Sequence, residues 1–307
     1  MVGECRSLRK CPGVSLPPLH TFTAASSKGA PGRRLLSRFW LPSCPRKESP
    51  PPLKMRPISV TPLLYRLWGA ARWKNLVQQQ EKWVGDCQSG FRRPHRGPTD
   101  SSMSAAAYTE EGHARGMHQV AVDLDLQKAF DHIPRAVVWA LASQVRMPPG
   151  IVLAWPSWYS QDQARYYRHC GGLGQPWQAR SGFVQGCALS CIAQNLLMST
   201  LLRALDKETT KFPTVDFKET AYAHDTKWQF RCPAGEERAM VACVQGCLRI
   251  ATTWADEAKQ LFNAAKSAVW TSHAELTAEN CHLQGANIPF CGAYVFPGGQ
   301  ASQPAKS

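Results

Sequence analysis

The sequence predicts a mixed α+β fold, because strand-length and helix-length apolar patterns alternate along the chain. Residues 118–126 alternate Val and Leu with Ala and Asp, which is the pattern of a buried strand with one polar face. The stretch ETAYAHDTKWQF, residues 219–230, predicts a β-hairpin with a polar tip at His224 and Asp225. With 307 residues, 44% of them hydrophobic, the chain can bury a sizeable core in one large domain or two smaller ones.

The N-terminal third is expected to hold a polar leader and two helices. Residues 1–53 are rich in Pro, Ser, Arg and Lys, which predicts a disordered leader and leaves three roles open: a basic arm that touches nucleic acid, an organelle-targeting peptide, or no specific role. Pro62 introduces apolar residues at helical spacing, so we expect a helix over 62–82 after an extended piece at 56–60. The loop CQSGFRRPHRGPTD then leads to a second helix over 99–115.

Helices dominate the expectations for the rest of the chain. Pro134 begins a predicted helix that runs to about residue 146, and PPG stops it before another helical stretch. Apolar residues at helical spacing predict further helices over 188–205 and 235–261. FNAAKSAVW and YVFPGG are short strand candidates near the C-terminus.

Charge narrows the class of partner. The chain has 36 Lys and Arg against 22 Asp and Glu, a net charge of +14, which points first to a polyanion such as nucleic acid. An anionic membrane surface is the weaker alternative, since the sequence shows no uninterrupted apolar run of roughly 20 residues. We therefore expect no membrane partner.

Cysteine usage favours reduced, buried thiols. The chain has twelve cysteines but no apolar signal segment at its start, so a secreted disulfide scaffold is not expected. The pairs Cys187/Cys191 and Cys243/Cys247 and the Cys281-His282 doublet lack the spacings typical of structural zinc. Packing in the core is the favoured interpretation.

Three chemical signals follow one another along the chain. A strand ends at Asp125, the loop SGFVQGCALS leads into a helix, and the hairpin tip carries Asp225. Carboxylates from two adjacent strands can hold a pair of Mg²⁺ ions that activate a 3′-hydroxyl and neutralise a triphosphate. A single Asp on a strand would be too common to support this chemistry.

Six segments in this order resemble the motifs of reverse transcriptases, most closely those of non-LTR (LINE-like) retrotransposons. They are RPISVTPLLYRLW, QSGFR, VDLDLQKAFDHI, SGFVQGCALS, YAHDTKW and FNAAKS. The resemblance covers roughly residues 54–270 and implies right-hand polymerase fingers and palm, with an antiparallel palm sheet flanked by helices. It also implies an RNA template, a DNA primer, deoxynucleoside triphosphates and two Mg²⁺ ions, with Mn²⁺ as an alternative. Oligomeric state stays open.

The resemblance assigns the reacting centre to four residues. Asp125 looks like the first metal-binding carboxylate, and Asp225 like the second Asp of the family's Y-A-D-D turn. Lys266 resembles the lysine of the later N-x-x-K motif, which begins here at Asn263 and places a proton donor near the phosphates. His224 stands where the family has the first Asp of the turn.

Other residues are implied to bind the incoming nucleotide. Arg56 looks like the fingers arginine that grips the triphosphate. Phe130 falls where an aromatic ring packs beneath the sugar and obstructs a 2′-hydroxyl, with a core aromatic as the alternative. Asp131 matches a second family Asp, but a helix N-cap before Pro134 explains it equally well.

A Gly/Gln loop and a basic loop complete the implied contacts, with Gln185 and Gly186 assigned to the incoming nucleotide and Gly182 to nucleic acid. The loop residues Gly182, Gln185 and Gly186 resemble the family's G-x-P-Q-G, in which Val184 replaces the usual proline. Glycines there let the backbone approach template and nucleotide closely. Three arginines are assigned to a basic fingers surface: Arg92, Arg93 and Arg96.

His224 predicts a loss of polymerase activity. Imidazole nitrogen suits Zn²⁺ or Cu²⁺, whereas Mg²⁺ demands hard oxygen ligands, and the substitution also removes one negative charge. Asp123 shares a face with Asp125, but two strand steps separate them by about 6.6 Å, which is long for one metal cluster. A non-catalytic nucleic-acid-binding module and a decayed retroelement remnant are the alternatives to an enzyme.

The expected organisation follows from the motifs. Residues 1–53 form the leader, 54–120 a fingers-like region, and 121–275 a palm with interleaved fingers segments. Residues 276–307 are expected to be a shortened palm-to-thumb connection, with the thumb missing. Family analogy suggests an intracellular, nuclear location, and organelle targeting by the leader stays open.

Overall fold

The computed structural model describes residues 39–42, 59–92, 97–159, 165–169, 172–272 and 281–291. Its elements, in chain order, are β1 (Phe39–Pro42), α1 (Leu63–Gln80), α2 (Pro98–Ala114), β2 (His118–Leu124), α3 (Ala129–His132), α4 (Arg135–Gln144), α5 (Pro149–Ser157), β3 (Arg165–His169), β4 (Gly172–Leu173), α6 (Ala188–Thr209), β5 (Asp216–Tyr222), β6 (Asp225–Cys232), α7 (Glu237–Glu257), the 3-10 helix η4 (Ala264–Lys266), β7 (Ala268–Thr271), β8 (His282–Leu283) and β9 (Ala286–Asn287).

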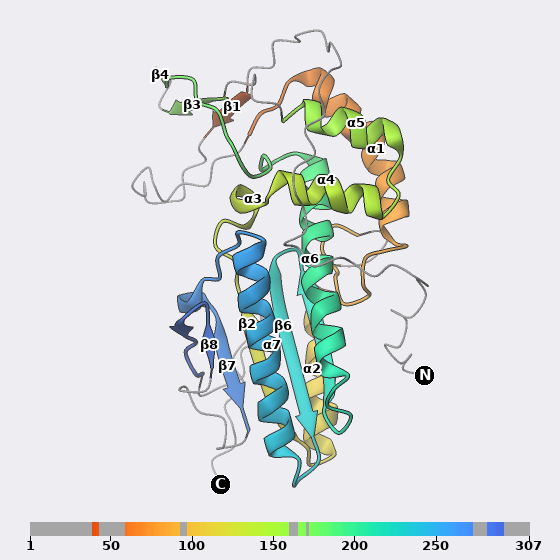
Figure 1. Ribbon diagram of the computed structural model, residues 1–307, viewed down its shortest axis with the longest axis vertical. Coiled ribbons are helices and arrows are strands. Elements are labelled where there is room, and N and C mark those ends of the chain that lie inside the picture. Colours follow the sequence, from red (N-terminus) through yellow and green to blue (C-terminus); the bar gives the residue numbers. More distant parts are fainter. Residues whose placement is uncertain are drawn as a thin grey trace.

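A four-stranded antiparallel sheet with the order β5-β6-β2-β7 forms the lower part of the molecule (Figure 1). Val120 and Val122 of β2 are almost fully buried, as the alternating pattern predicted. Leu124, the last residue of β2, pairs with Thr226, so Asp125, which follows it, comes beside Asp225. The register of two strands thus brings together carboxylates that are 100 residues apart in sequence.

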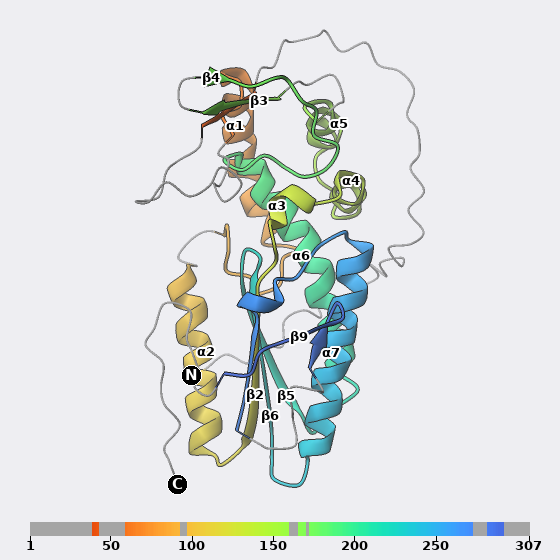
Figure 2. The same cartoon turned by 90° about the vertical axis from the view of Figure 1, so that its left-hand side faces the viewer.

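Helices cover both faces of this sheet. Figure 2 shows α2 on one face and the long helices α6 and α7 on the other. Helix α2 begins after Gly97, whose backbone N–H donates to the Asp100 carboxylate, and Pro98 occupies its first position. The sheet and its helices confirm the predicted α+β architecture.

The upper part is built on helices and aromatic side chains. Helices α1, α4 and α5 lie beside the small sheet β1-β3-β4, above the four-stranded sheet (Figure 1). Trp155 and Phe183 are buried, and the ring of Trp139 lies edge-on to both of them. Residues 39–42 fall within the predicted disordered leader, yet they form β1 and pair in parallel with β3.

Most predicted helices and strands are present with boundaries shifted by a few residues. Helix α6 ends at Thr209 rather than 205, and α7 covers Glu237–Glu257 rather than 235–261. Asp225 was predicted at the hairpin tip but is the first residue of β6, so the tip is Ala223 and His224. The YVFPGG strand candidate lies outside the described residues.

Helix α6 is the central core helix. Among the described helices it alone is long and apolar enough to cross a membrane by length and composition, but 72% of its most apolar window is buried inside the protein. It contacts α1, α4 and α7. Its apolar character is therefore explained by packing. The eight described cysteines are free thiols, and six of them are buried, as predicted.

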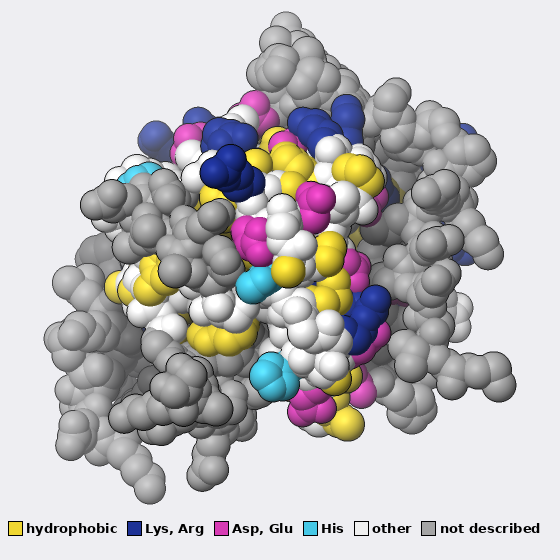
Figure 3. Space-filling view, turned by 90° about the horizontal axis from the view of Figure 1, so that it is seen from below, with side chains coloured by type: hydrophobic (Ala, Val, Ile, Leu, Met, Phe, Trp, Pro, Cys, Tyr) yellow, Lys and Arg dark blue, Asp and Glu magenta, His cyan; other side chains and the backbone are white. Residues whose placement is uncertain are grey.

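Charges are mixed and paired at the end of the sheet remote from the hairpin tip. Figure 3 shows acidic and basic side chains interspersed on this end of the molecule. Arg231 pairs with Asp216 at 2.7 Å and with Glu111 at 3.0 Å, and His118 lies 3.1 Å from Glu237. Among the described residues, the basic side chains at this end are thus interspersed with acidic partners rather than gathered into one basic surface.

Glu219 on β5 gives a testable dependence of stability on pH. Its Oε1 accepts a hydrogen bond from the Cys87 thiol at 3.0 Å, whereas its Oε2 is buried and has no hydrogen-bond partner among the described residues. Burial raises the pKa of Glu219 from 4.5 to about 8, so the folded state holds this proton more tightly than the unfolded state. The stabilisation is complete below pH 4.5 and is lost as pH rises through 8.

In the unmodified protein we therefore expect the free energy of unfolding to fall by roughly 3 kcal/mol between pH 5 and pH 8. In Glu219→Gln this fall should be absent, because the glutamine side chain does not titrate. Urea unfolding of both proteins across this range measures the difference. Glu257→Gln, at an exposed position of α7, controls for the loss of one carboxylate. Equal slopes for the unmodified protein and Glu219→Gln would contradict the assignment.

Candidate active site

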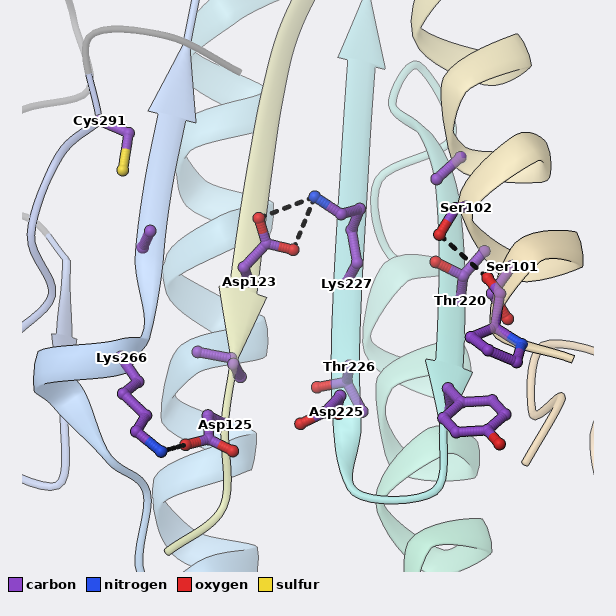
Figure 4. Close-up of a pocket in the computed structure, with 15 residues that line it drawn as sticks. Ser101, Ser102, Asp123, Asp125, Thr220, Asp225, Thr226, Lys227, Lys266 and Cys291 are labelled. Carbon is purple, nitrogen blue, oxygen red and sulfur yellow. Dashed lines mark hydrogen bonds and ion pairs between the residues drawn. The ribbon is translucent and has the colours of Figure 1, made fainter. Parts of the chain in front are cut away.

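Three groups meet at the end of the sheet where the hairpin turns. Asp125 follows the last residue of β2, Asp225 begins β6, and His224 lies in the turn between β5 and β6. Each offers one ligand atom, and these atoms lie within 4.8 Å of one another. Asp125 and Asp225 are among the residues that line a cavity of about 430 Å³ between α2 and the sheet (Figure 4). The arrangement is suited to a divalent cation.

The segment that follows α7 supports Asp125. The Asn263 backbone N–H donates to the Asp125 carbonyl at 2.8 Å, and its side-chain amide donates to Oδ2 at 3.5 Å. Lys266 Nζ lies 3.6 Å from the same Oδ2 (Figure 4), and the lysine side chain is 66% exposed. The N-x-x-K residues therefore converge on the first carboxylate, and the ammonium group is open to an anionic ligand.

Electrostatics at the cluster favour neutralisation by a cation. Partial desolvation and the neighbouring Asp125 raise the pKa of Asp225 above its usual range, while His224 and Lys266 act in the opposite direction. Asp225 is 64% exposed and Asp125 only 21%. The two carboxylates thus repel one another, and a bound positive charge would relieve this repulsion.

His224 faces the carboxylates with one nitrogen. Its Nε2 lies 3.8 Å from Asp225 Oδ1, and its Nδ1 is buried without a hydrogen-bond partner. The ring of Phe130 meets the His224 ring edge-on, with centroids 6.3 Å apart. The Phe91 ring in turn lies edge-on to Phe130, with centroids 6.4 Å apart. Phe130 is half-buried and contacts the cluster through its ring contact with His224.

Asp123 does not join the cluster. Both of its carboxylate oxygens lie 2.7 Å from Lys227 Nζ, an ion pair that spans β2 and β6 (Figure 4). Burial raises the pKa of Asp123, and Lys227 opposes this. The ion pair holds Asp123 away from the cation position, in agreement with the long spacing expected from the sequence.

The loop from Gly182 to Gly186 packs beside Phe130. The Phe183 N–H donates to the Phe130 carbonyl at 2.8 Å, and Gln185 Nε2 lies 3.5 Å from Asp131 Oδ1. Gly182 has φ +75°, and a Cβ there would lie 2.4 Å from the Asp131 carbonyl oxygen. Gly182 is thus required for backbone packing, whereas Gly186 is exposed.

Two further sequence predictions are corrected. Asp131 is not the N-cap of the helix after Pro134, because it lies inside α3, while Pro134 itself is the N-cap of α4. Arg92 was assigned to an exposed basic surface, but its side chain is 2% exposed and paired with Glu81. Three other predicted binding residues lie outside the described residues: Arg56, Arg93 and Arg96.

Sequence reasoning missed Gln88. It was part of the quoted QSGFR motif, but its side chain is fully buried and bonds to the hairpin turn rather than to a ligand. The available signal was a glutamine within a glycine-containing loop, but its hydrogen-bond partner Ala223 lies 135 residues away in the sequence.

Comparison with known families identifies the chain. The family model for reverse transcriptase (RNA-dependent DNA polymerase) matches residues 45–291. The chain belongs to the reverse transcriptase family. A comparison with curated proteins gave no match.

Solved telomerase structures share the fold of this reverse transcriptase-family chain. Telomerase from Candida albicans, in complex with a fragment of telomeric RNA, matches 79% of the chain and 43% of its own chain, with 12% identity and a TM-score of 0.55. Apo telomerase from Candida tropicalis matches 82% of this chain and 47% of its own chain, with 10% identity and a TM-score of 0.56. The chain thus spans less than half of these two proteins, and the likeness confirms the fingers-and-palm fold. The family uses divalent metal ions, in accord with the Asp-His-Asp cluster.

Proposed function

We propose that this chain is the fingers-and-palm part of a LINE-like retrotransposon reverse transcriptase whose Mg²⁺-dependent polymerisation is impaired by His224. The observation that carries the proposal is the convergence of Asp125, His224 and Asp225 within 4.8 Å at the end of an antiparallel palm sheet. The ancestral reaction is RNA-templated addition of deoxynucleotides to a DNA 3′ end. The order and wording of the motifs support the LINE-like subtype, and the same analogy leads us to propose nuclear action.

The donor set does not fit a pair of Mg²⁺ ions. Two Mg²⁺ ions need hard oxygen ligands and several negative charges, whereas this cluster offers two carboxylates and one imidazole. One nitrogen and two carboxylate oxygens instead suit a single ion such as Mn²⁺ or Zn²⁺. We therefore propose that the cluster binds one transition-type divalent ion more tightly than Mg²⁺.

The protein residues around the cluster suit a nucleotide. Lys266 is exposed beside Asp125 and can neutralise phosphate oxygens, and the Phe130 ring can pack against a sugar. The loop of Gln185 lies next to Phe130 through Asp131, so a base-paired nucleotide would meet all three. These roles are those expected for a deoxynucleoside triphosphate.

A second cavity, of about 340 Å³, suits single-stranded RNA on the fingers side of this loop. Tyr167 and Trp177 stack in parallel there, with ring centroids 5.5 Å apart, and the Arg165 guanidinium lies over the Trp177 ring. Arg180 also lines the cavity and is exposed. Aromatic faces with interleaved cations are the features that hold unpaired bases and their phosphates. We propose this cavity as a contact for the RNA template.

RNA binding tests the proposal directly. Fluorescence anisotropy with a single-stranded RNA should show affinity that falls steeply with salt, because bound phosphates release counterions. Tyr167→Leu should weaken binding about 10-fold without changing the salt slope, since it removes only stacking. Arg180→Gln should lower the magnitude of the slope by about 0.7.

Tyr166→Leu is the matched control, because neighbouring strand residues point to opposite faces. Absence of RNA binding at low salt would contradict both the polymerase assignment and the second candidate, a non-catalytic nucleic-acid-binding module. His224 favours that second candidate. Both candidates predict no primer extension by the unmodified chain in Mg²⁺, so extension in Mn²⁺ separates them: the impaired polymerase should show residual extension there and the binding module should show none.

A further inference from the structure

The turn that carries His224 is held from outside the hairpin. Residues 87–90 run alongside β5, where the Ser89 N–H donates to the Ala221 carbonyl at 2.7 Å and the Ala221 N–H donates to the Cys87 carbonyl at 2.8 Å. Gln88 thus lies beside Ala221, two residues before Ala223, and its side chain is fully buried.

The Gln88 amide bonds to both peptide groups of Ala223. Its Oε1 accepts from the Ala223 N–H at 2.9 Å and from the Gly90 N–H at 2.8 Å. Its Nε2 donates to the Ala223 carbonyl at 2.9 Å. One side chain therefore fixes the residue immediately before His224 at two points, in a site from which water is excluded.

The turn needs this support because Ala223 is in a strained conformation. Its φ is +61°, in the left-handed region that glycine occupies readily and alanine rarely. The close approach also depends on Gly90, since a Cβ there would lie 2.3 Å from the Ala223 nitrogen. Packing in this segment is thus adapted to one turn geometry.

Two more buried amides hold the segment in place. Asn195 of α6 donates to the Gly90 carbonyl and to Gln80 Oε1, each at 3.0 Å. Gln80 of α1 donates to the Phe91 carbonyl at 3.0 Å. Within the described part of the chain, the side-chain bonds of Gln80 and Asn195 go to residues 90 and 91 and to one another, so Gln88 is the member of this network that bonds to the hairpin turn.

We propose that Gln88 is a positioning residue that fixes the Ala223 turn so that His224 and Asp225 face Asp125. Its effect on metal affinity rests on the proposed function, whereas its effect on the turn does not. Groups that orient the ligands of a metal commonly change its affinity by about 10-fold to 100-fold when they are removed.

Gln88→Met tests the proposal, with Gln80→Met as its matched control. Both variants replace a fully buried amide by an apolar chain of similar length, but only the first removes bonds to the turn. The readouts are hydrogen exchange at the Ala223 amide and Mn²⁺ affinity measured by electron paramagnetic resonance. We expect Gln88→Met to expose the Ala223 amide and to weaken Mn²⁺ binding by about 10-fold or more, and Gln80→Met to change neither.

Rescue separates positioning from general stability. Adding Ala223→Gly to Gln88→Met should restore most of the Mn²⁺ affinity, because glycine adopts a positive φ without support. If Gln88→Met does not fold, Gln88→Glu keeps an oxygen for the Ala223 N–H but loses the donor to its carbonyl, and should give an intermediate loss.

Unchanged exchange and unchanged Mn²⁺ affinity in a folded Gln88 variant would overturn the proposal, as would equal losses in Gln80→Met. If the unmodified protein binds no Mn²⁺, the metal assignment fails. The proposed effect of Gln88 on metal affinity then fails as well, and hydrogen exchange at the Ala223 amide alone decides whether Gln88 holds the turn.

Discussion

The His224→Asp variant is expected to extend a DNA primer on an RNA template in Mg²⁺ at least about 100-fold faster than the unmodified chain, which corresponds to about 2.7 kcal/mol of transition-state stabilisation. The substitution returns a hard oxygen ligand and one negative charge to a cluster that already has Asp125 and Asp225 within 4.8 Å of residue 224. Lys266 and Phe130 are retained in this variant, although the edge-on contact of the Phe130 ring with the imidazole is lost.

Radioactive primer extension in Mg²⁺ and then in Mn²⁺ measures the effect. His224→Asn is the control for size, because it removes the imidazole without adding a carboxylate. Asp125→Asn combined with His224→Asp should return extension to background. Ready extension by the unmodified chain in Mg²⁺ would contradict the argument about His224, and so would absence of extension by His224→Asp if that variant binds RNA.

The sheet and the reacting centre could be predicted because their signals are local. Alternation along β2 and β-formers around a polar tip specify a strand and a hairpin within a few residues. Motif order then assigned Asp125 and Asp225 to one site, and strand register brings them together. Chain connectivity and side-chain period are sufficient for such features.

Roles that depend on a distant partner could not be predicted. The contact of Gly182 with nucleic acid stays a prediction, whereas its close packing against the Asp131 carbonyl, which lies where a Cβ would be, has no local signal in the sequence. Gln88 and Ala223 are 135 residues apart, and no local pattern specifies their pairing. Arg92 was assigned to a basic surface because it lies in a loop rich in arginine. Its burial and its ion pair instead depend on the position of Glu81 in the folded chain, which the loop sequence does not reveal.

Arg92→Met is expected to lower the free energy of unfolding by about 3 kcal/mol. The Arg92 guanidinium bonds to both carboxylate oxygens of Glu81 and donates to the Gly85 carbonyl at 2.8 Å and the Gln88 carbonyl at 3.1 Å. Methionine would fill much of the space but leave these acceptors without a donor. If Gln88 positions the Ala223 turn as proposed, Mn²⁺ affinity should fall as well.

Urea unfolding measures the stability change, and RNA binding decides between the two roles assigned to Arg92. A buried structural arginine contributes nothing to counterion release, so the salt slope of RNA binding should be the same in Arg92→Met as in the unmodified chain. Arg115→Met is the control: this arginine is exposed and pairs with Glu111 four residues away on the same helix surface, so its loss should cost less than about 0.5 kcal/mol. A reduced salt slope together with unchanged stability would restore the assignment of Arg92 to a nucleic-acid-binding surface. The slope would show that Arg92 reaches phosphate, and the stability would show that its bonds to Glu81 and the two carbonyls are dispensable for folding.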